Sequence, residues 1–262
     1  MRFSRSKANV SRLTFTLGET LLLAIFVVLL TIHLAPGRRP AGPTWSIDPK
    51  WSRIFVERFG PDHYSAGLEE YIARDFFNDR RNGVFVDVGA FRAKAGNNTY
   101  RLERDFGWSG LAIDANQAVA SEYVERPKTI FVVAFVGNED EGTAILHVPA
   151  HDGATASFDR SFTEQFDAVA SSPKVRRRTL NSLLEERRFE RVNFLSMDIE
   201  LSEPAALEGF DIARYRPDLV CIEAHVTTRD RILEYFARHQ YVLIAKYLAA
   251  DPLNYWFRPL AR

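Results

Sequence analysis

Short apolar runs alternate with stretches of helical apolar spacing along the chain from residue 83 onward. The runs are rich in Val, Ile, Leu and Phe, and such runs are typical of buried strands in a parallel sheet. We expect strands at 84–88, 111–113, 129–136, 144–148 (on an edge), 192–199, 219–223, 241–247 and 255–257. We expect helices at 98–106, 118–124 and 180–187, from Pro204 onward, and at 230–238. This repeated alternation predicts an α/β domain with a doubly wound, mostly parallel sheet.

Two further stretches flank or interrupt this pattern. Gly67–Phe77 has helical spacing, and we interpret it as a lead-in helix that covers one face of the sheet. His151–Lys174 is polar with weak periodicity. It is interpreted as a lid-like loop or an insertion.

The N-terminal part of the chain carries the pattern of a membrane anchor. Residues 21–35 contain no Asp, Glu, Lys or Arg, and extension back to Leu13 gives enough length to span a bilayer while including Glu19. Cleavage after Ala35 would require a small residue at position 33, where His33 stands, so an uncleaved anchor is favoured over a removed signal peptide. We therefore predict a single-pass membrane protein. Basic residues lie on both sides of the segment, and the side of the membrane stays open.

These patterns divide the chain into five parts. We expect a basic tail at 1–12, a transmembrane signal-anchor helix at 13–35, a Pro/Gly linker at 36–44, a lead-in helical segment at 45–82, and the α/β domain at 83–262. Lys plus Arg and Asp plus Glu number 34 each, so no net charge attracts nucleic acid. The single cysteine, Cys221, excludes an internal disulfide and is expected to be a buried thiol.

Acidic residues mark the ends of the first two predicted strands. Ligands of such sheets bind at the carboxyl ends of the strands, and an acid at the end of the second strand, here Asp114, suits the two hydroxyls of a ribose. The stretch from Gly89 to Lys94 lacks the G-x-G-x-x-G pattern of nicotinamide-binding folds. Asp87 before Gly89 suits instead a positively charged ligand, such as the amino group of S-adenosylmethionine. The alternatives are an Asp-Gly loop that caps the next helix and, for Asp114, an acid that binds a turn amide.

Further polar residues follow the strands predicted at 192–199 and 219–223. Asp198 and Glu200 share one face if the strand extends that far, and a pair of carboxylates either raises the proton affinity of one or creates a cation site. No metal is assigned. Glu203 suits the start of the helix at Pro204. His225 is the candidate general base, with a structural hydrogen bond as the alternative.

One sequence motif is better explained by local structure. Asn97-Asn98-Thr99 matches the N-glycosylation pattern, but a glycan there would collide with the proposed ligand loop. We expect Asn98 to cap the following helix.

Taken together, these segments resemble the FkbM family, a branch of the class I S-adenosylmethionine-dependent methyltransferases. The resemblance spans roughly residues 83–225. The blocks that carry it are Val84–Ala90, Asn98–Glu103, Gly107–Asn116 and Leu195–Glu203.

The resemblance implies a Rossmann-like methyltransferase fold with a seven-stranded sheet whose last strand is antiparallel. It implies S-adenosyl-L-methionine as cofactor, with Asp87 and Gly89 against its methionine part and Asp114 on its ribose. Ala90 and Asn98 of the matching blocks join the expected cofactor-binding residues. The implied reaction is O-methylation of a hydroxyl on a glycan or secondary metabolite.

The expected catalytic residues are His225, Asp198 and Glu200, one of which removes the hydroxyl proton.

Two positions depart from the pattern of the family. Arg92-Ala93 stands where relatives usually have Asp-Gly, and Leu201 stands where they commonly have Gly. These departures motivate a second hypothesis, a catalytically silent, membrane-tethered binding or scaffold module. A nucleotide-dependent oxidoreductase is the third hypothesis, and the missing glycines disfavour it.

Overall fold

The computed structural model describes residues 49–151 and 153–261. The basic tail, the predicted transmembrane helix over 13–35 and the linker lie outside the described residues. Within the described ranges, none of the helices combines the length and the apolar character needed to cross a bilayer.

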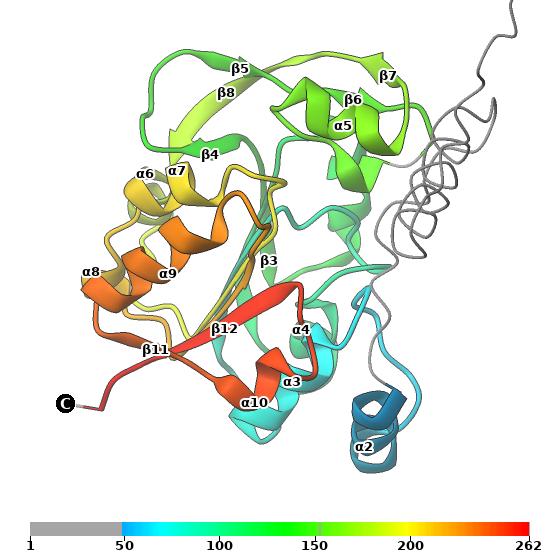
Figure 1. The fold of residues 1–262 in the computed structure, drawn as a ribbon, viewed down its shortest axis with the longest axis vertical. Helices are drawn as coiled ribbons and strands as arrows, with labels where there is room; N and C mark the ends of the chain where they lie inside the picture. Colours follow the sequence, from blue (N-terminus) through cyan, green and yellow to red (C-terminus); the bar gives the residue numbers. More distant parts are fainter. Residues whose placement is uncertain (1–48, 152, 262) are drawn as a thin grey trace, which may run out of the picture. The chain divides into compact units, whose positions relative to one another are not determined.

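The domain is built on a seven-stranded sheet with the order β11-β12-β10-β9-β1-β2-β3 (Figure 1). Its strands are β1 Val84–Val88, β2 Ser109–Asp114, β3 Thr129–Val133, β9 Phe194–Met197, β10 Leu219–Glu223, β11 Tyr241–Leu243 and β12 Asn254–Pro259. Neighbours pair in parallel from β10 to β3, whereas β12 runs antiparallel to both β10 and β11. The predicted α/β class and the seven-stranded sheet with an antiparallel last strand are confirmed.

Helices pack on both faces of this sheet (Figure 1). One layer contains α6 Leu180–Glu186, α7 Glu203–Glu208, α8 Ile212–Tyr215 and α9 Arg229–Arg238, and the other contains α2 Pro49–Phe59, α3 Glu69–Phe77, α4 Tyr100–Phe106 and α10 Ala245–Leu248. Because strand side chains alternate, Val86 packs with the first layer and Phe85 with the second. Cys221 is buried in the second layer, as predicted.

Several predicted boundaries are wrong, and tertiary pairing explains most of them. The strand expected at 129–136 splits at Ala134 into β3 and β4 Phe135–Gly137, because β4 pairs with β8 Lys174–Thr179 in a separate sheet. The strand expected at 144–148 divides into β5 Thr143–Ile145 and β6 Val148–Pro149. The strand expected at 241–247 ends at Leu243, since Tyr247 is buried on the second layer as part of α10.

The polar segment 151–174 is an insertion with structure of its own. Its described residues form η2 Gly153–Thr155, α5 Arg160–Phe166 and β7 Val169–Ser171, and β7 pairs with β6. The short helix expected at 118–124 is present as a 3-10 helix, η1 Gln117–Glu125. Figure 1 shows the two small sheets and α5 grouped at one end of the main sheet.

Candidate active site

The carboxyl ends of β1, β2 and β9 are tied together through the main chain. Gly89 has a φ of +80°, and a Cβ atom there would lie 1.7 Å from the carbonyl oxygen of Asp198, so only glycine fits. The amides of Gly89 and Ala90 both donate to the carbonyl of Ile113, at 2.9 and 3.1 Å. The carboxyl ends of these three strands are therefore fixed relative to one another.

A small cleft with a cavity volume of about 50 Å³ opens where these strands end. The strand tips and the insertion share its lining. The lining residues are Gly89, Phe91, Asp114, Ala115, Leu146, Gly153, Ala154, Ala156, Phe158, Asp198, Ile199 and Glu200. The insertion thus forms one wall of the cleft, and its lining residues were not anticipated individually. The weak periodicity of 151–174 and its interpretation as a lid were the only signal.

Asp114 lies in the cleft with its carboxylate oriented by the main chain. One oxygen accepts from the amide of Phe91 and the other from the amide of Asn116, each at 2.7 Å. Burial raises the pKa of Asp114. Each carboxylate oxygen keeps a second lone pair, so the group can accept hydrogen bonds from a diol while it holds the turn.

Asp87, in contrast, lies beneath the cleft rather than in its lining. It is 2% exposed, and the hydroxyl of Thr99 donates to its Oδ2 at 2.9 Å. Burial raises the pKa of Asp87 to about 6. The direct contact expected between Asp87 and the ligand is therefore not supported, because the carboxylate is engaged inside the domain.

The other two expected cofactor residues also have internal roles. Asn98 does not cap α4, whose N-cap is Thr99; its side chain donates instead to the hydroxyl of Ser196 at 3.0 Å. Ala90 is buried, and its carbonyl accepts from the side-chain amide of Asn97 at 2.9 Å. Neither residue is among those that line the cleft.

Four carboxylates and a histidine gather where β9 and β10 end, and we call them the acidic cluster: Asp198, Glu200, Glu203, Glu223 and His225. The strand β9 ends at Met197, so the strand face expected for Asp198 and Glu200 does not exist. A turn with positive φ at Glu200 brings the pair together with β10 instead. Nε2 of His225 lies 3.0 Å from Oε1 of Glu223 and 3.6 Å from Oε2 of Glu200.

Protonation within the acidic cluster bears on the role predicted for His225. The neighbouring Glu200 and Glu223 carboxylates raise the pKa of His225 to about 10, which favours the imidazolium form at neutral pH. This direction favours a positioning role for His225, and its role as general base stays a prediction. Burial raises the pKa of Glu200 to about 7. Asp198 is open to the cleft, yet desolvation by its surroundings and the nearby Glu223 carboxylate raise its pKa well above the usual range.

Glu203 lies at the start of α7, where its Oε1 accepts from the amide of Ile199 at 2.9 Å. Its side chain is completely buried, and burial raises its pKa to about 8. It was interpreted as a helix-start residue, and its membership of the cluster could not be seen from its spacing alone.

The insertion closes over the acidic cluster. The hydroxyl of Ser157 donates to the carbonyl of Glu200 at 2.8 Å. The ring of Phe162 meets His225 edge to face, with 5.2 Å between the ring centres. The cluster therefore has a roof made by the insertion.

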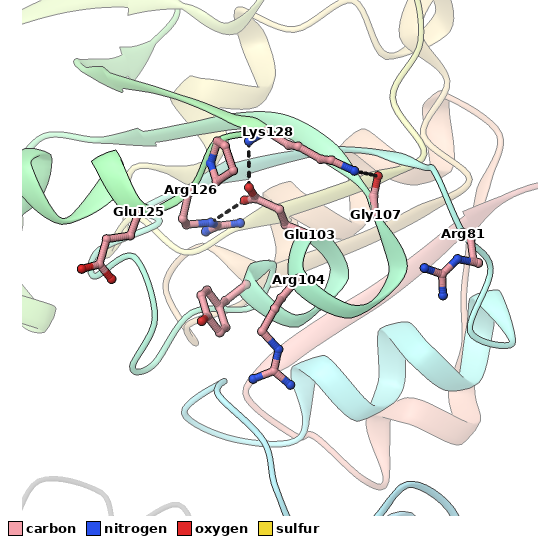
Figure 2. A pocket seen from close by; sticks show the side chains of 9 residues that line it. Arg81, Glu103, Arg104, Gly107, Glu125, Arg126 and Lys128 are labelled. Carbon is pink, nitrogen blue, oxygen red and sulfur yellow. Dashed lines mark hydrogen bonds and ion pairs between the residues drawn. The ribbon is translucent and has the colours of Figure 1, made fainter.

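A second hollow lies at the opposite end of the strands, and Figure 2 shows its lining. Arg81, Gly107 and Lys128 precede β1, β2 and β3, so this hollow faces the amino ends of the strands. Its charges are largely paired internally, with Arg126 on Glu103 at 2.8 Å and Nζ of Lys128 on the Gly107 carbonyl at 3.3 Å. It lies away from the edge that carries the acidic residues.

Comparison with known proteins assigns the chain to a family. The family model described as methyltransferase FkbM domain matches residues 87–243, more than half of the chain. No curated protein matches the sequence. Among solved structures, a protein of Galdieria sulphuraria assigned as a sarcosine dimethylglycine methyltransferase is 12% identical, with 74% of this chain and 75% of that chain covered and a TM-score of 0.35. An O-methyltransferase of Bacillus cereus in complex with SAH is 13% identical, with 91% and 89% covered and a TM-score of 0.33.

Proposed function

Because the chain belongs to the FkbM methyltransferase family, we propose that it transfers the methyl group of S-adenosyl-L-methionine to a hydroxyl of a glycan or small secondary metabolite. The observation that carries this proposal is the position of Asp114. It is oriented in a cleft whose lining also includes Asp198 and Glu200 of the acidic cluster.

The residues that line the cleft suit an adenosyl ligand in their chemistry. Asp114 would hold the ribose hydroxyls, and apolar side chains such as Phe91, Leu146 and Phe158 offer surfaces for the adenine ring. S-adenosylmethionine, when bound, supplies an electrophilic methyl group on a positively charged sulfur. Asp198 and Glu200 place carboxyl groups in the lining, and in their ionised form these groups would favour a cation.

The chain's own residues would handle the acceptor. Glu200 lines the cleft and would take the proton of the acceptor hydroxyl. His225, paired with Glu200 and Glu223, would hold that carboxylate in place as an imidazolium. The fixed strand tips and the roof over the cluster support transfer by positioning the two reactants in line and excluding water.

The two sequence departures leave the lining of this cleft intact. Arg92 is exposed and lies over the ring of Phe91, with 5.5 Å between its guanidinium carbon and the ring centre. Leu201 adopts a positive φ and is not among the lining residues. Neither residue occupies the space proposed for the cofactor.

The apolar segment at 13–35 supports a further part of the proposal, a membrane tether for this domain. The acceptor would then be presented near a membrane surface. Carbonate washing of membranes from cells that express the full chain tests this: an anchored protein stays in the membrane pellet, and extraction into the supernatant contradicts the tether.

Calorimetry of the purified full chain with S-adenosylhomocysteine tests the central proposal. We expect Asp114→Ala to weaken binding by about 1–3 kcal/mol, since the ligand's ribose hydroxyls lose their acceptor in a desolvated cleft. Asp230→Ala, at an aspartate whose side chain is 89% exposed, should leave affinity unchanged. Equal affinities for the Asp114→Ala and Asp230→Ala variants would place the cofactor elsewhere, and preferential binding of a nicotinamide dinucleotide would replace methyl transfer with redox chemistry.

A further inference from the structure

We propose that Asp198, Glu203 and Glu223 form a binding site for a divalent cation. One carboxylate oxygen of each lies within 4.8 Å of the others, so a single ion can contact all three. From the sequence, a cation site at Asp198 and Glu200 stayed open, with no metal assigned. The three residues proposed here come from the end of β9, the start of α7 and the end of β10.

Unpartnered oxygens point to a missing ligand at this place. Glu203 is 0% exposed, and while its Oε1 accepts from a main-chain amide, its Oε2 has no hydrogen-bond partner. The Oε2 of Glu223 is likewise buried without a partner. Buried carboxylate oxygens are nearly always hydrogen-bonded or bound to a metal ion, because leaving them bare is costly.

The local charge balance supports the same conclusion. Among the described residues, the ion pairs of the acidic cluster are internal: His225 pairs with Glu200 and Glu223. Asp198 and Glu203 have no such pair within that part of the chain. A divalent cation between the three carboxylates would supply the positive charge that the surrounding side chains do not.

The donor set selects the class of cation. Three carboxylates without a thiol suit a hard ion such as Mg²⁺, Mn²⁺ or Ca²⁺. The positions are rigid, since the Asp198 amide donates to the Val88 carbonyl at 2.9 Å and Glu203 is fixed by Ile199. Asp198 is also exposed to the cleft, which gives the ion a path of entry.

The role of the cation, though not its binding, rests on the proposed function. An ion at this site would lie beside the cleft in which the acceptor hydroxyl is presented. A bound divalent ion lowers the pKa of a coordinated hydroxyl and fixes its orientation. The cation and Glu200 would then act on the same oxygen.

Binding of Mn²⁺ to the chelator-treated full chain, followed by the loss of the free-ion paramagnetic resonance signal, tests the site directly. We expect one Mn²⁺ per chain, displaced by excess Mg²⁺, and at least tenfold weaker binding in Glu203→Gln and in Asp198→Asn. Glu208→Gln is the matched control, because Glu208 lies on the same helix with a half-exposed side chain. It should bind Mn²⁺ like the parent.

Two results would overturn the site: no Mn²⁺ binding by the parent at millimolar concentration, or equal affinity in the Glu203→Gln and Glu208→Gln variants. Asp198→Asn guards against a folding artefact, since its exposed side chain is dispensable for packing. Calorimetry with S-adenosylhomocysteine on the same samples separates the two proposals. Intact cofactor binding without Mn²⁺ binding removes only the cation site, whereas the reverse removes only the proposed methyl transfer.

Discussion

Two groups of buried charge in this domain are built in opposite ways. The Arg126 network consists of Asp87, Asn97, Thr99, Glu103 and Arg126, and the guanidinium of Arg126 donates to Glu103, Asn97 and Thr99 at 2.8, 3.0 and 3.2 Å. The acidic cluster has four carboxyl groups and one histidine, and its Glu203 Oε2, Glu223 Oε2 and His225 Nε2 have no hydrogen-bond partner in the described part of the chain. The first group is satisfied from within the chain and acts as scaffold. The second is incomplete without a ligand, which is the pattern expected of a functional site.

The largest effect on stability should come from removing the Arg126 guanidinium from its network. Arg126 is 2% exposed, and Arg126→Met would leave Glu103 buried without its guanidinium. We expect the free energy of unfolding to fall by about 3–5 kcal/mol, measured by denaturant titration. Arg160→Met is the control, because the Arg160–Glu164 pair is exposed and should contribute less than about 1 kcal/mol. A small decrease in the free energy of unfolding of Arg126→Met would mean that water enters the network readily. The contrast with the acidic cluster would then be false.

The second effect concerns pH and Asp87. Its pKa in the folded chain is about 6 against an ordinary 3.8, so the folded state holds a proton more tightly than the unfolded state does. The stability associated with that proton is present below the ordinary pKa and is lost as pH rises through about 6. Asp87→Asn cannot titrate. Its stability relative to the parent should therefore rise by about 2 kcal/mol between pH 4.5 and pH 7.

Unfolding of the two proteins in denaturant at both pH values measures this difference, in which the other acids cancel. Asp230→Asn, at an exposed aspartate, should show no such change. A relative stability of Asp87→Asn that is flat with pH would show that Asp87 is already well compensated by Thr99 and the Arg126 guanidinium.

The contrast between the two groups also explains what the sequence could predict. The bounds of strands such as β1 and β10 were predicted closely, because a short, continuous apolar run is typical of a strand that is buried on both faces of a sheet. Polar residues at the ends of those runs, Asp114 and Glu200 among them, were found by the same logic. Partners distant in the chain could not be predicted from spacing. Nothing in the sequence around Asp87 indicates that Thr99 and Arg126 enclose it.

The same limit applies to protonation in the acidic cluster. The position of His225 after β10, considered alone, predicts a general base. Its charge depends on Glu200, which reaches it only because the chain leaves β9 at Met197 and turns back through positive φ angles. That turn requires a left-handed backbone, a property that a pattern of polar and apolar residues does not encode.

The smallest predicted effect lies in this turn, at Leu201. Its φ of +80° is strained for any residue with a Cβ atom. Deleting the half-buried side chain destabilises the domain in either variant, so the informative quantity is the difference between Leu201→Gly and Leu201→Ala. We expect the glycine variant to be more stable by about 1 kcal/mol, since only it relieves the backbone. Denaturant unfolding of both variants provides the measurement.

A matched pair of substitutions elsewhere makes the sign of that difference decisive. Glu234 is exposed within α9, where the backbone is right-handed, and there Glu234→Gly should be less stable than Glu234→Ala by about 1 kcal/mol. Opposite orders at the two positions would show that the loop carrying the acidic cluster is held under strain in the folded chain. The same order at both would mean that residues 200 and 201 relax in solution, and the acidic cluster would then lose the fixed geometry on which its contrast with the Arg126 network depends.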